Sequence, residues 1–280
     1  MYNRAQPAHA FRIARGQSDR CTLNIKLAWR LTRVILHLLA GLAVCTIVFP
    51  FAGDGLRGRF TRRWSRRLLA LCRVQVEPAP GAPALEHAMI VANHVSWLDI
   101  FVINSLHPCR FVAKAEIRSW PVLGWLAAAA GTVFIARGSR RDLRAIFKGL
   151  VAVLRQGQRV AFFPEGTTSR QGQMLPFHAN LLEAAIDAKV AVQPYAIEYV
   201  DAFGAHHTAV DYVGETTFVN SFFAILSGAP VRARLTCLAP IEAAGMHRRE
   251  LAQATHDAIA GALQARTGEL PDQGPASMLA

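Results

Sequence analysis

A histidine and an aspartate five positions apart are the residues of this chain whose types and spacing most directly suggest catalysis. His94 and Asp99 lie in the stretch VANHVSWLDI, directly after a short apolar run of the kind that forms buried strands. With His94 in the turn after the strand and Asp99 in the first turn of a helix, the two side chains can meet. A carboxylate bonded to one imidazole nitrogen fixes that nitrogen as N–H, which leaves the other nitrogen free to act as a general base.

The same stretch also fits an ordinary helix start. Ser96 and Asp99 have the S-x-x-D spacing of a capping box, in which two side chains satisfy backbone N–H groups at the beginning of a helix. This interpretation predicts a helix over residues 96–106 and gives His94 no catalytic partner. The choice between the two interpretations therefore depends on the rest of the chain.

Three further stretches combine a predicted strand with residues suited to binding. Residues 131–137 (GTVFIAR) end a strand with Arg137, whose guanidinium group can bind a phosphate through two parallel hydrogen bonds. Residues 162–169 (FFPEGTTS) place a tight turn with Gly166 after a strand, which offers hydroxyl and backbone N–H donors. Residues 192–197 form a strand-like run interrupted by a proline. Each stretch by itself is also compatible with a plain strand end.

The elements that must position these residues alternate between strands and helices. Strand-like apolar runs are predicted at residues 88–92, 110–114, 132–136, 160–163, 190–199 and 231–238. Helical patterns are predicted at residues 96–106, 119–130, 139–157 and 247–266. Such alternation predicts a single α/β domain with a mixed, largely parallel sheet flanked by helices. We place this domain at residues 76–266, with a proline-rich linker at its start (77–84) and a flexible tail at 267–280.

The first 75 residues have the composition of a membrane anchor. Residues 34–52 are a run of 19 uncharged residues, which is long enough to cross a bilayer. Arginines flank both ends, so the positive-inside rule gives no orientation, while Gly41 and Pro50 permit a bend. We expect a re-entrant or shallow insertion, with a single span and a buried core helix as the alternatives. Residues 56–73 predict a basic amphipathic helix at the membrane interface.

The net charge of +12 in this 280-residue chain is concentrated near the N-terminus. Residues 1–73 contain 14 of the 31 Lys and Arg residues but only two of the 19 acidic residues, which leaves the remainder neutral. A nucleic-acid-binding protein more often carries its basic residues on the folded domain, so we expect no nucleic-acid partner. Membrane lipids are the expected partner of the basic segment, at the cytoplasmic face of the inner or plasma membrane.

The order and spacing of four motifs resemble one family, the glycerolipid (lysophospholipid) acyltransferases typified by 1-acyl-glycerol-3-phosphate acyltransferase. That family shows N-H-x4-D, then G-x-x-F-I-x-R, then F-P-E-G-T-x-S, then a strand of the V-x-P type. The corresponding stretches here are residues 93–99, 131–137, 163–169 and 192–197. The resemblance covers roughly residues 85–200, and the hydrophobic segment before it agrees with the family's N-terminal anchor.

The resemblance implies transfer of a fatty acyl group from acyl-CoA or acyl carrier protein to the hydroxyl of a lysolipid. It implies that 1-acyl-sn-glycerol-3-phosphate is the acceptor, although the E-G-T-T-S variant is also similar to members that acylate lyso-ornithine lipids. The thioester is a co-substrate, and neither a cofactor nor a metal is implied. The roles carried over are catalysis by His94 and Asp99, and acceptor binding by Arg137, Glu165, Gly166 and Thr167.

Two other classes of protein remain as alternatives. A membrane-bound lipid esterase would share the anchor and a His/Asp pair, but it needs a serine nucleophile, and the G-x-S-x-G motif is absent from the sequence. A basic membrane-binding protein without activity would explain residues 1–73 and leave the four ordered motifs unexplained. The five cysteines are scattered and form no CxxC or Cys/His cluster, so neither a disulfide framework nor a structural zinc site is implied.

Overall fold

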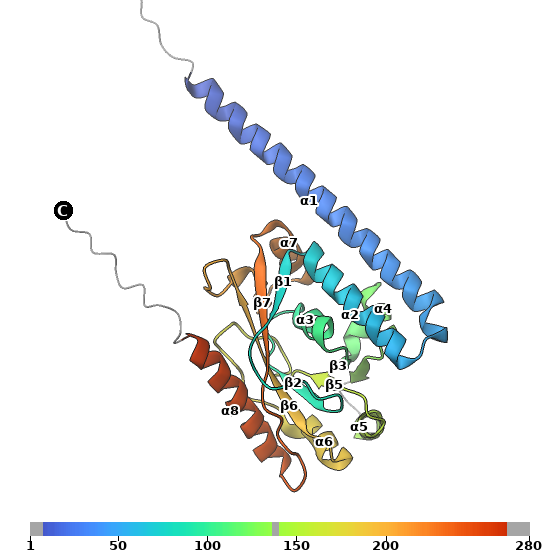
Figure 1. Cartoon of the computed structure of the whole chain (residues 1–280). Helices are drawn as coiled ribbons and strands as arrows, with labels where there is room; N and C mark the ends of the chain where they lie inside the picture. Colours follow the sequence, from blue (N-terminus) through green and yellow to red (C-terminus); the bar gives the residue numbers. More distant parts are fainter. Residues whose placement is uncertain (1–7, 136–139, 268–280) are drawn as a thin grey trace, which may run out of the picture.

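The computed structural model describes the backbone of residues 8–135 and 140–267, and the side chains of residues 25–135 and 147–266. The chain forms an α/β fold around a seven-stranded sheet (Figure 1). Along the sheet the strand order is β1-β7-β6-β2-β5-β3-β4. The strands are β1 Val74–Pro78, β2 Met89–Ala92, β3 Arg110–Lys114, β4 Val133–Ile135, β5 Val160–Phe162, β6 Val192–Val200 and β7 Val231–Cys237.

Neighbouring strands of the described sheet are parallel except for the antiparallel pair β6 and β7. This confirms the predicted mixed, largely parallel sheet. Six of the seven strands coincide with predicted runs. The seventh, β1, pairs with β7 and lies partly in the stretch predicted as a linker. The position of β1 also means that the predicted boundary between residues 75 and 76 falls inside a strand.

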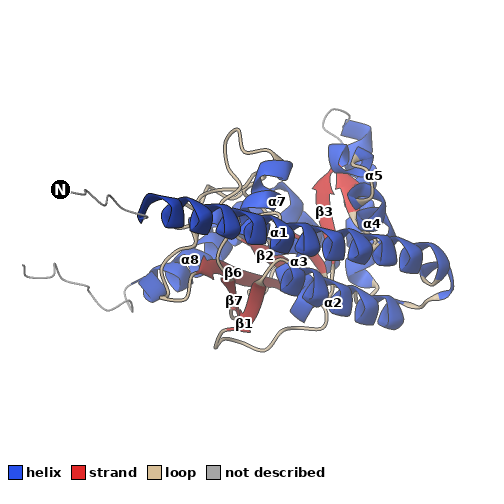
Figure 2. Cartoon of the chain, turned by 90° about the horizontal axis from the view of Figure 1, so that it is seen from above, coloured by secondary structure: helices blue, strands red, loops and turns tan. Residues whose placement is uncertain are grey.

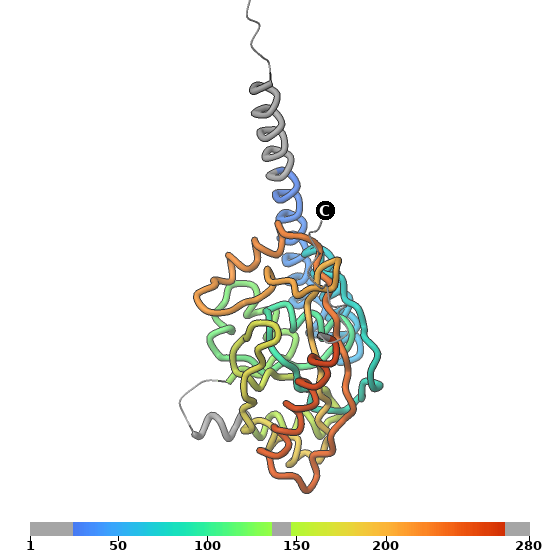
Figure 3. The backbone as a smooth tube through the Cα atoms, turned by 90° about the vertical axis from the view of Figure 1, so that its left-hand side faces the viewer, coloured from blue at the N-terminus to red at the C-terminus, as the bar shows by residue number. Residues whose placement is uncertain are grey.

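Helices cover both faces of the sheet (Figures 1 and 3). The helix α8 lies in front of the sheet in Figure 3, and α5 and α6 share its side, whereas α1, α2, α3 and α7 lie on the other side. The helices are α1 Ala8–Ile47, α2 Asp54–Leu71, α3 Asp99–Leu106, α4 Leu123–Ala129, α5 Arg140–Arg155, α6 Glu183–Ala188, α7 Phe218–Ser227 and α8 Arg248–Thr267. Short 3-10 turns are η1 Phe49–Phe51, η2 Ala115–Ser119, η3 Ala179–Leu182 and η4 Thr208–Val210.

The core consists of two apolar layers, one on each face of the sheet. In β2, Ile90 and Ala92 belong to the layer under α2 and α3, whereas Met89 and Val91 belong to the layer under α5, α6 and α8. Because successive strand residues point to opposite faces, a strand buried on both sides must be apolar throughout. All four residues of β2 are indeed buried, which explains its uninterrupted apolar sequence.

The N-terminal helices form a hairpin that packs on the α/β body. The helix α1 runs back against α2 through η1, and Figure 2 shows the two helices side by side. The ring of Trp64 in α2 stacks on His37 of α1 at 4.9 Å, and its indole N–H donates to the His37 carbonyl. A Cβ atom at Gly41 would lie 2.4 Å from the indole nitrogen of Trp64, so only glycine permits this close approach.

Residues Ile25–Phe51 are long and apolar enough to cross a membrane, and they keep an apolar surface uncovered by the body. The exposed side chains include Trp29, Leu36 and Phe51, which is 90% exposed. Such a surface on a helix of this length indicates membrane association. The opposite side of α1 carries Val34, which is buried in the core, so α1 also contacts the body.

The predicted amphipathic helix is α2, and its apolar side contributes to the body's core. Leu68, Leu69 and Leu71 are buried, and α2 packs against α3. The arginines of α2 are partly or fully exposed. The division of the chain into an anchor, a domain and a tail stays a prediction, and residues 268–280 of the tail lie outside the described part of the chain.

His107, at the carboxyl end of α3, gives the fold a predictable dependence on pH. Its Nδ1 lies 3.0 Å from the Tyr195 hydroxyl, and burial lowers its pKa to about 4, with smaller contributions from Arg159 and Arg62. As the pH falls, His107 is therefore protonated in the unfolded chain before it is protonated in the folded protein. The stability contributed by neutral His107 is complete above about pH 6.5 and is lost as the pH falls toward 4.

We expect this histidine to lower the free energy of unfolding by about 1 kcal/mol between pH 7.5 and pH 5, because its partial exposure to solvent screens part of the effect of the shift. Urea unfolding in mild detergent measures the change, and His107→Gln isolates it because the other histidines contribute equally to both proteins. The variant is expected to lose less stability than the wild type over this interval. An equal loss in the two proteins would contradict the assignment.

Candidate active site

The predicted base and its carboxylate meet at the carboxyl end of β2. The Nδ1 atom of His94 lies 2.8 Å from Oδ2 of Asp99. Asp99 is completely buried, whereas the His94 side chain keeps 18% of its surface exposed. Since Nδ1–H donates to the carboxylate, Nε2 is the imidazole nitrogen that is left with a lone pair. A partly exposed ring with a lone pair on Nε2 can accept a proton from a bound molecule.

Asp99 receives four hydrogen bonds. Its Oδ2 atom also accepts from the backbone N–H groups of Val95 and Ser96, at 2.8 and 2.9 Å. Its Oδ1 atom accepts from the Tyr199 hydroxyl at 2.5 Å. These donors compensate a buried negative charge that would otherwise be costly. The same contacts prevent the carboxylate from rotating away from His94.

The capping-box interpretation is half right. The Asp99 carboxylate accepts from the Ser96 N–H, as the second residue of such a box does. However, α3 begins at Asp99 rather than at residue 96, and the Ser96 hydroxyl is buried without a partner among the described atoms. The carboxylate therefore closes the turn between strand and helix while it also binds His94, and the two interpretations describe one structure.

The loop after β5 fixes the backbone of His94 from both sides. Glu165 accepts the His94 N–H with Oε1 at 2.8 Å, and the Ser169 N–H donates to the His94 carbonyl at 2.8 Å. The second Glu165 oxygen accepts the Leu175 N–H at 2.9 Å. Glu165 is only 3% exposed, so both of its oxygens are occupied inside the protein. The predicted motif at residues 163–169 thus reaches His94 through its backbone.

The aromatic ring of Phe163 fixes the plane of the imidazole. It stacks on His94 with ring centres 3.9 Å apart and an angle of 8° between the planes. Phe163 itself stacks on Phe111 of β3, so the contact is supported from behind. The sequence motif contained Phe163, but nothing in its spacing indicated this role.

Asn93 joins the end of β2 to β6. Its side-chain NH₂ group donates to the backbone carbonyl of Ile197 at 2.9 Å, and its side-chain oxygen accepts the Ile197 N–H at 2.8 Å. The two bonds continue the β2–β6 pairing one residue beyond Ala92, with a side chain in place of backbone. As a result, the residues of β6 that follow Ile197 lie beside the turn that holds His94.

The other predicted site residues fall into two groups. Gly166 and Thr167 are exposed at the tip of the turn after Glu165, and Gly166 has a φ of +71°, which favours glycine. Arg137 lies outside the described residues, two positions after the last residue of β4. Within the described residues no group of three His, Cys, Asp or Glu side chains is arranged to hold a metal ion.

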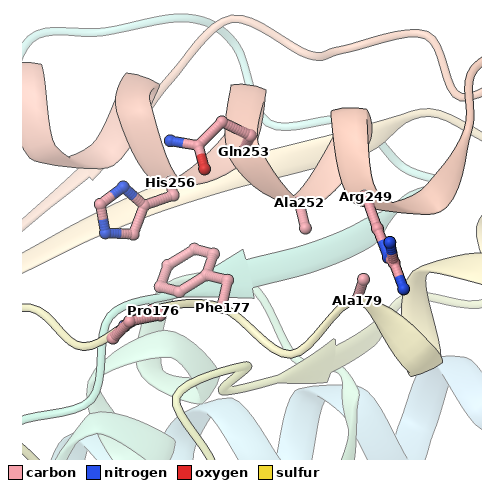
Figure 4. Close-up of a pocket in the computed structure, with 7 residues that line it drawn as sticks. All are labelled: Pro176, Phe177, Ala179, Arg249, Ala252, Gln253 and His256. Atoms are coloured by element: carbon pink, nitrogen blue, oxygen red, sulfur yellow. The ribbon is translucent and has the colours of Figure 1, made fainter.

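A hollow of about 330 Å³ lies elsewhere, between α8 and the loop that precedes η3 (Figure 4). Its walls include Phe177 and, from α8, Arg249, Gln253 and His256. None of the residues predicted to form the site contributes to these walls. The predicted site residues that the structure describes lie instead at the ends of β2 and β5, beside β6, which is the edge where open α/β sheets bind ligands.

Comparison with known proteins shows the family to which the chain belongs. A family model described as Acyltransferase matches residues 73–198. A lyso-ornithine lipid O-acyltransferase from Pseudomonas aeruginosa is 39% identical over 208 residues, which cover 74% of this chain and 80% of that protein. The chain belongs to the acyltransferase family. This acyltransferase is also 45% identical, over 146 residues, to a 1-acyl-sn-glycerol-3-phosphate acyltransferase from Neisseria gonorrhoeae, with 51% of this chain and 57% of the relative covered.

The fold of the acyltransferase has a solved counterpart. The crystal structure of the 1-acyl-sn-glycerophosphate acyltransferase PlsC from Thermotoga maritima superposes with a TM-score of 0.61 and 21% sequence identity. The match covers 86% of this chain and 98% of the other. At this identity the likeness establishes the shared fold, which confirms the predicted architecture.

Proposed function

We propose that this acyltransferase moves a fatty acyl group from acyl-CoA or acyl carrier protein to the free hydroxyl of a lysolipid. The observation that carries the proposal is the 2.8 Å contact between His94 and the buried Asp99 at the open edge of the sheet. We take 1-acyl-sn-glycerol-3-phosphate as the acceptor, with phosphatidic acid as the product. The thioester serves as co-substrate, and the reaction requires neither a metal nor a resident cofactor.

His94 acts as the general base in this reaction. Its Nε2 accepts the proton of the acceptor hydroxyl while the hydroxyl oxygen attacks the thioester carbonyl. Collapse of the tetrahedral intermediate then expels the thiolate, and the imidazolium of His94 donates its proton to this thiolate. Asp99 holds Nδ1–H and stabilises the imidazolium charge between the two steps. Because the hydroxyl attacks directly, no acyl-enzyme intermediate forms.

Acceptor binding falls to the exposed part of the turn after β5 and to Arg137. Gly166 and Thr167 offer backbone N–H and hydroxyl donors to a phosphate or glycerol group, and Arg137 supplies positive charge. Glu165 was predicted to bind the acceptor too. Its buried carboxylate, with both oxygens bonded to backbone N–H groups, supports a positioning role instead.

The name of one relative supports a second candidate acceptor. The Pseudomonas aeruginosa relative is named lyso-ornithine lipid O-acyltransferase, and it aligns with more of this chain than the Neisseria gonorrhoeae relative does. Lyso-ornithine lipid is therefore the alternative acceptor for the same His94 chemistry. The apolar surface of α1 and the arginines of α2 fit a protein bound to the membrane at its cytoplasmic face, where acyl thioesters are made.

An acceptor screen tests this proposal. The purified protein in lipid vesicles is incubated with acyl-CoA or acyl carrier protein thioester, and with lysophosphatidic acid, lyso-ornithine lipid or another lysolipid. We expect radiolabelled acyl groups to appear in phosphatidic acid. Faster transfer to lyso-ornithine lipid would replace the acceptor, whereas thioester hydrolysis without transfer to any lysolipid would overturn the proposal.

Replacement of Arg137 is expected to weaken acceptor binding. Loss of a charge-assisted contact to phosphate costs about 1.5–3 kcal/mol, so Arg137→Ala should raise the KM for lysophosphatidic acid roughly tenfold to a hundredfold. The kcat should change less, because the His94 pair is intact. Steady-state kinetics measure both values, with Arg155→Ala at the carboxyl end of α5 as the matched control. An unchanged KM would remove Arg137 from the acceptor site.

A further inference from the structure

Tyr199 reaches the proposed catalytic pair from a distant part of the chain. It lies near the end of β6, is 0% exposed, and donates its hydroxyl hydrogen to Oδ1 of Asp99 at 2.5 Å. This is the one hydrogen bond that Oδ1 accepts from the described residues, whereas Oδ2 accepts three. The Tyr199 hydroxyl therefore balances the carboxylate on the side that faces away from His94.

The surroundings of Tyr199 keep its hydroxyl protonated. Burial raises the pKa of Tyr199 well above its usual value, and the neighbouring Asp99 charge and hydrogen bond raise it further. A phenol in this state can only donate to the carboxylate. Its backbone N–H is also fixed, because it donates to the side chain of Gln171 in the loop after β5. The tyrosine is thus held by the same loop that holds the backbone of His94.

A second buried tyrosine on β6 provides a natural comparison. Tyr195 precedes Tyr199 by four residues, so the two side chains lie on the same face of the strand. Tyr195 is also 0% exposed, and its hydroxyl is bonded, but to Nδ1 of His107 rather than to Asp99. The two residues share residue type, strand, face and burial. They differ in whether the hydroxyl touches the catalytic pair.

We propose that Tyr199 is a positioning residue for acyl transfer, which holds Asp99 in the orientation that His94 requires. This inference rests on the proposed function of the His94–Asp99 pair. Without the tyrosine hydroxyl, Oδ1 becomes a buried carboxylate oxygen with no donor. The carboxylate can then turn, which moves the imidazole that it holds through Nδ1–H and misaligns Nε2 of His94 with the acceptor hydroxyl.

The test compares Tyr199→Phe with Tyr195→Phe, each of which removes one buried hydroxyl. A hydrogen bond to a charged group is worth about 1.5–3 kcal/mol, which corresponds to roughly a 10- to 100-fold loss of kcat for Tyr199→Phe. The KM values for both substrates should stay near those of the wild type. Tyr195→Phe should keep its kcat within about threefold. Melting curves in detergent establish that both variants are folded.

The pH profile separates positioning from a merely structural contribution. His94 and Tyr199 are the titratable side chains that contact Asp99 among the described residues. Loss of the donor leaves more negative charge on Asp99 beside the imidazole, so the acid limb of kcat/KM should move to higher pH in Tyr199→Phe. The limb should not move in Tyr195→Phe.

Fluorotyrosine provides a measurement that needs no hydroxyl to be lost. Fluorine makes the phenol a stronger donor, so 3-fluorotyrosine at position 199 should move the acid limb to lower pH, and at position 195 should leave it unchanged. If 3-fluorotyrosine at positions 199 and 195 gave equal rates and equal acid limbs of kcat/KM, the proposed role of Tyr199 would be overturned. That outcome is distinct from failure of the proposed function, which an active His94→Ala variant would reveal.

Discussion

His94→Ala is expected to lose acyl transfer by about 10²- to 10⁴-fold in kcat, which is the range that a positioned general base contributes. The reason is that Nε2 of His94 is the proton acceptor and alanine leaves no other base at the end of β2. The ring is partly exposed and contributes one stacking contact with Phe163, so the fold should survive. The measurement is the initial rate of radiolabelled lipid formation in vesicles.

His256→Ala provides the matched control for this prediction. His256 also lies next to a carboxylate, with Nδ1 3.4 Å from Oδ1 of Asp257, and its ring also contacts a phenylalanine. It belongs to α8, on the other side of the sheet. We expect a rate near that of the wild type for this variant. If His94→Ala were folded and retained a similar rate, His94 would not be the base.

Asp99→Asn is expected to lower kcat by about 10²- to 10³-fold while the fold is kept. An asparagine can place its oxygen where Oδ2 accepts three hydrogen bonds and its amide where Oδ1 lies, because the Tyr199 hydroxyl can turn to accept. What is lost is the negative charge that stabilises the imidazolium of His94. The defect should therefore appear in kcat and not in the KM for the lysolipid.

Asp257→Asn serves as the control, because it makes the same change beside His256. Kinetics and melting curves of both variants are measured in the same detergent. A folded Asp99→Asn protein with wild-type kcat would show that the carboxylate only closes the turn before α3. A raised KM with unchanged kcat would instead assign Asp99 to substrate binding.

The sheet could be predicted in detail because its central strands are buried on both faces. Such strands need continuous apolar runs, and β3 occupies the predicted residues 110–114 while β2 and β5 differ from prediction only at their ends. Two helix ends were also predictable, since Gly131 and Gly157 have positive φ values that terminate α4 and α5. These elements could be predicted because residues close together in the sequence determine them.

The elements that were missed depend on contacts far along the chain. β1 lies in a stretch rich in proline and becomes a strand because it pairs with β7, more than 150 residues later. The helix α7 has no charged residue and was not predicted; its aromatic side chains pack on Trp97, which follows β2. Periodicity within a short window contains no information about such partners.

The same distinction applies to the candidate site. The contact between His94 and Asp99 was predictable because the two residues lie five positions apart, on either side of one turn. Tyr199 lies 100 residues from Asp99, and its contact arises only when β6 pairs with β2. The Glu165 contact with the His94 backbone likewise requires β5 to lie beside β2. Sequence motifs marked the stretches, and the sheet order determined which atoms meet.

The central claim is that His94 and Asp99 act as one unit on the acceptor hydroxyl, and the double variant His94→Ala/Asp99→Asn tests it most directly. Initial rates of the two single variants and the double variant are measured with the same radiolabelled thioester, after subtraction of the rate in empty vesicles. If Asp99 works only through His94, the double variant should be as slow as His94→Ala, within about threefold. Losses that multiply in the double variant would contradict the claim, since the two residues would then act independently.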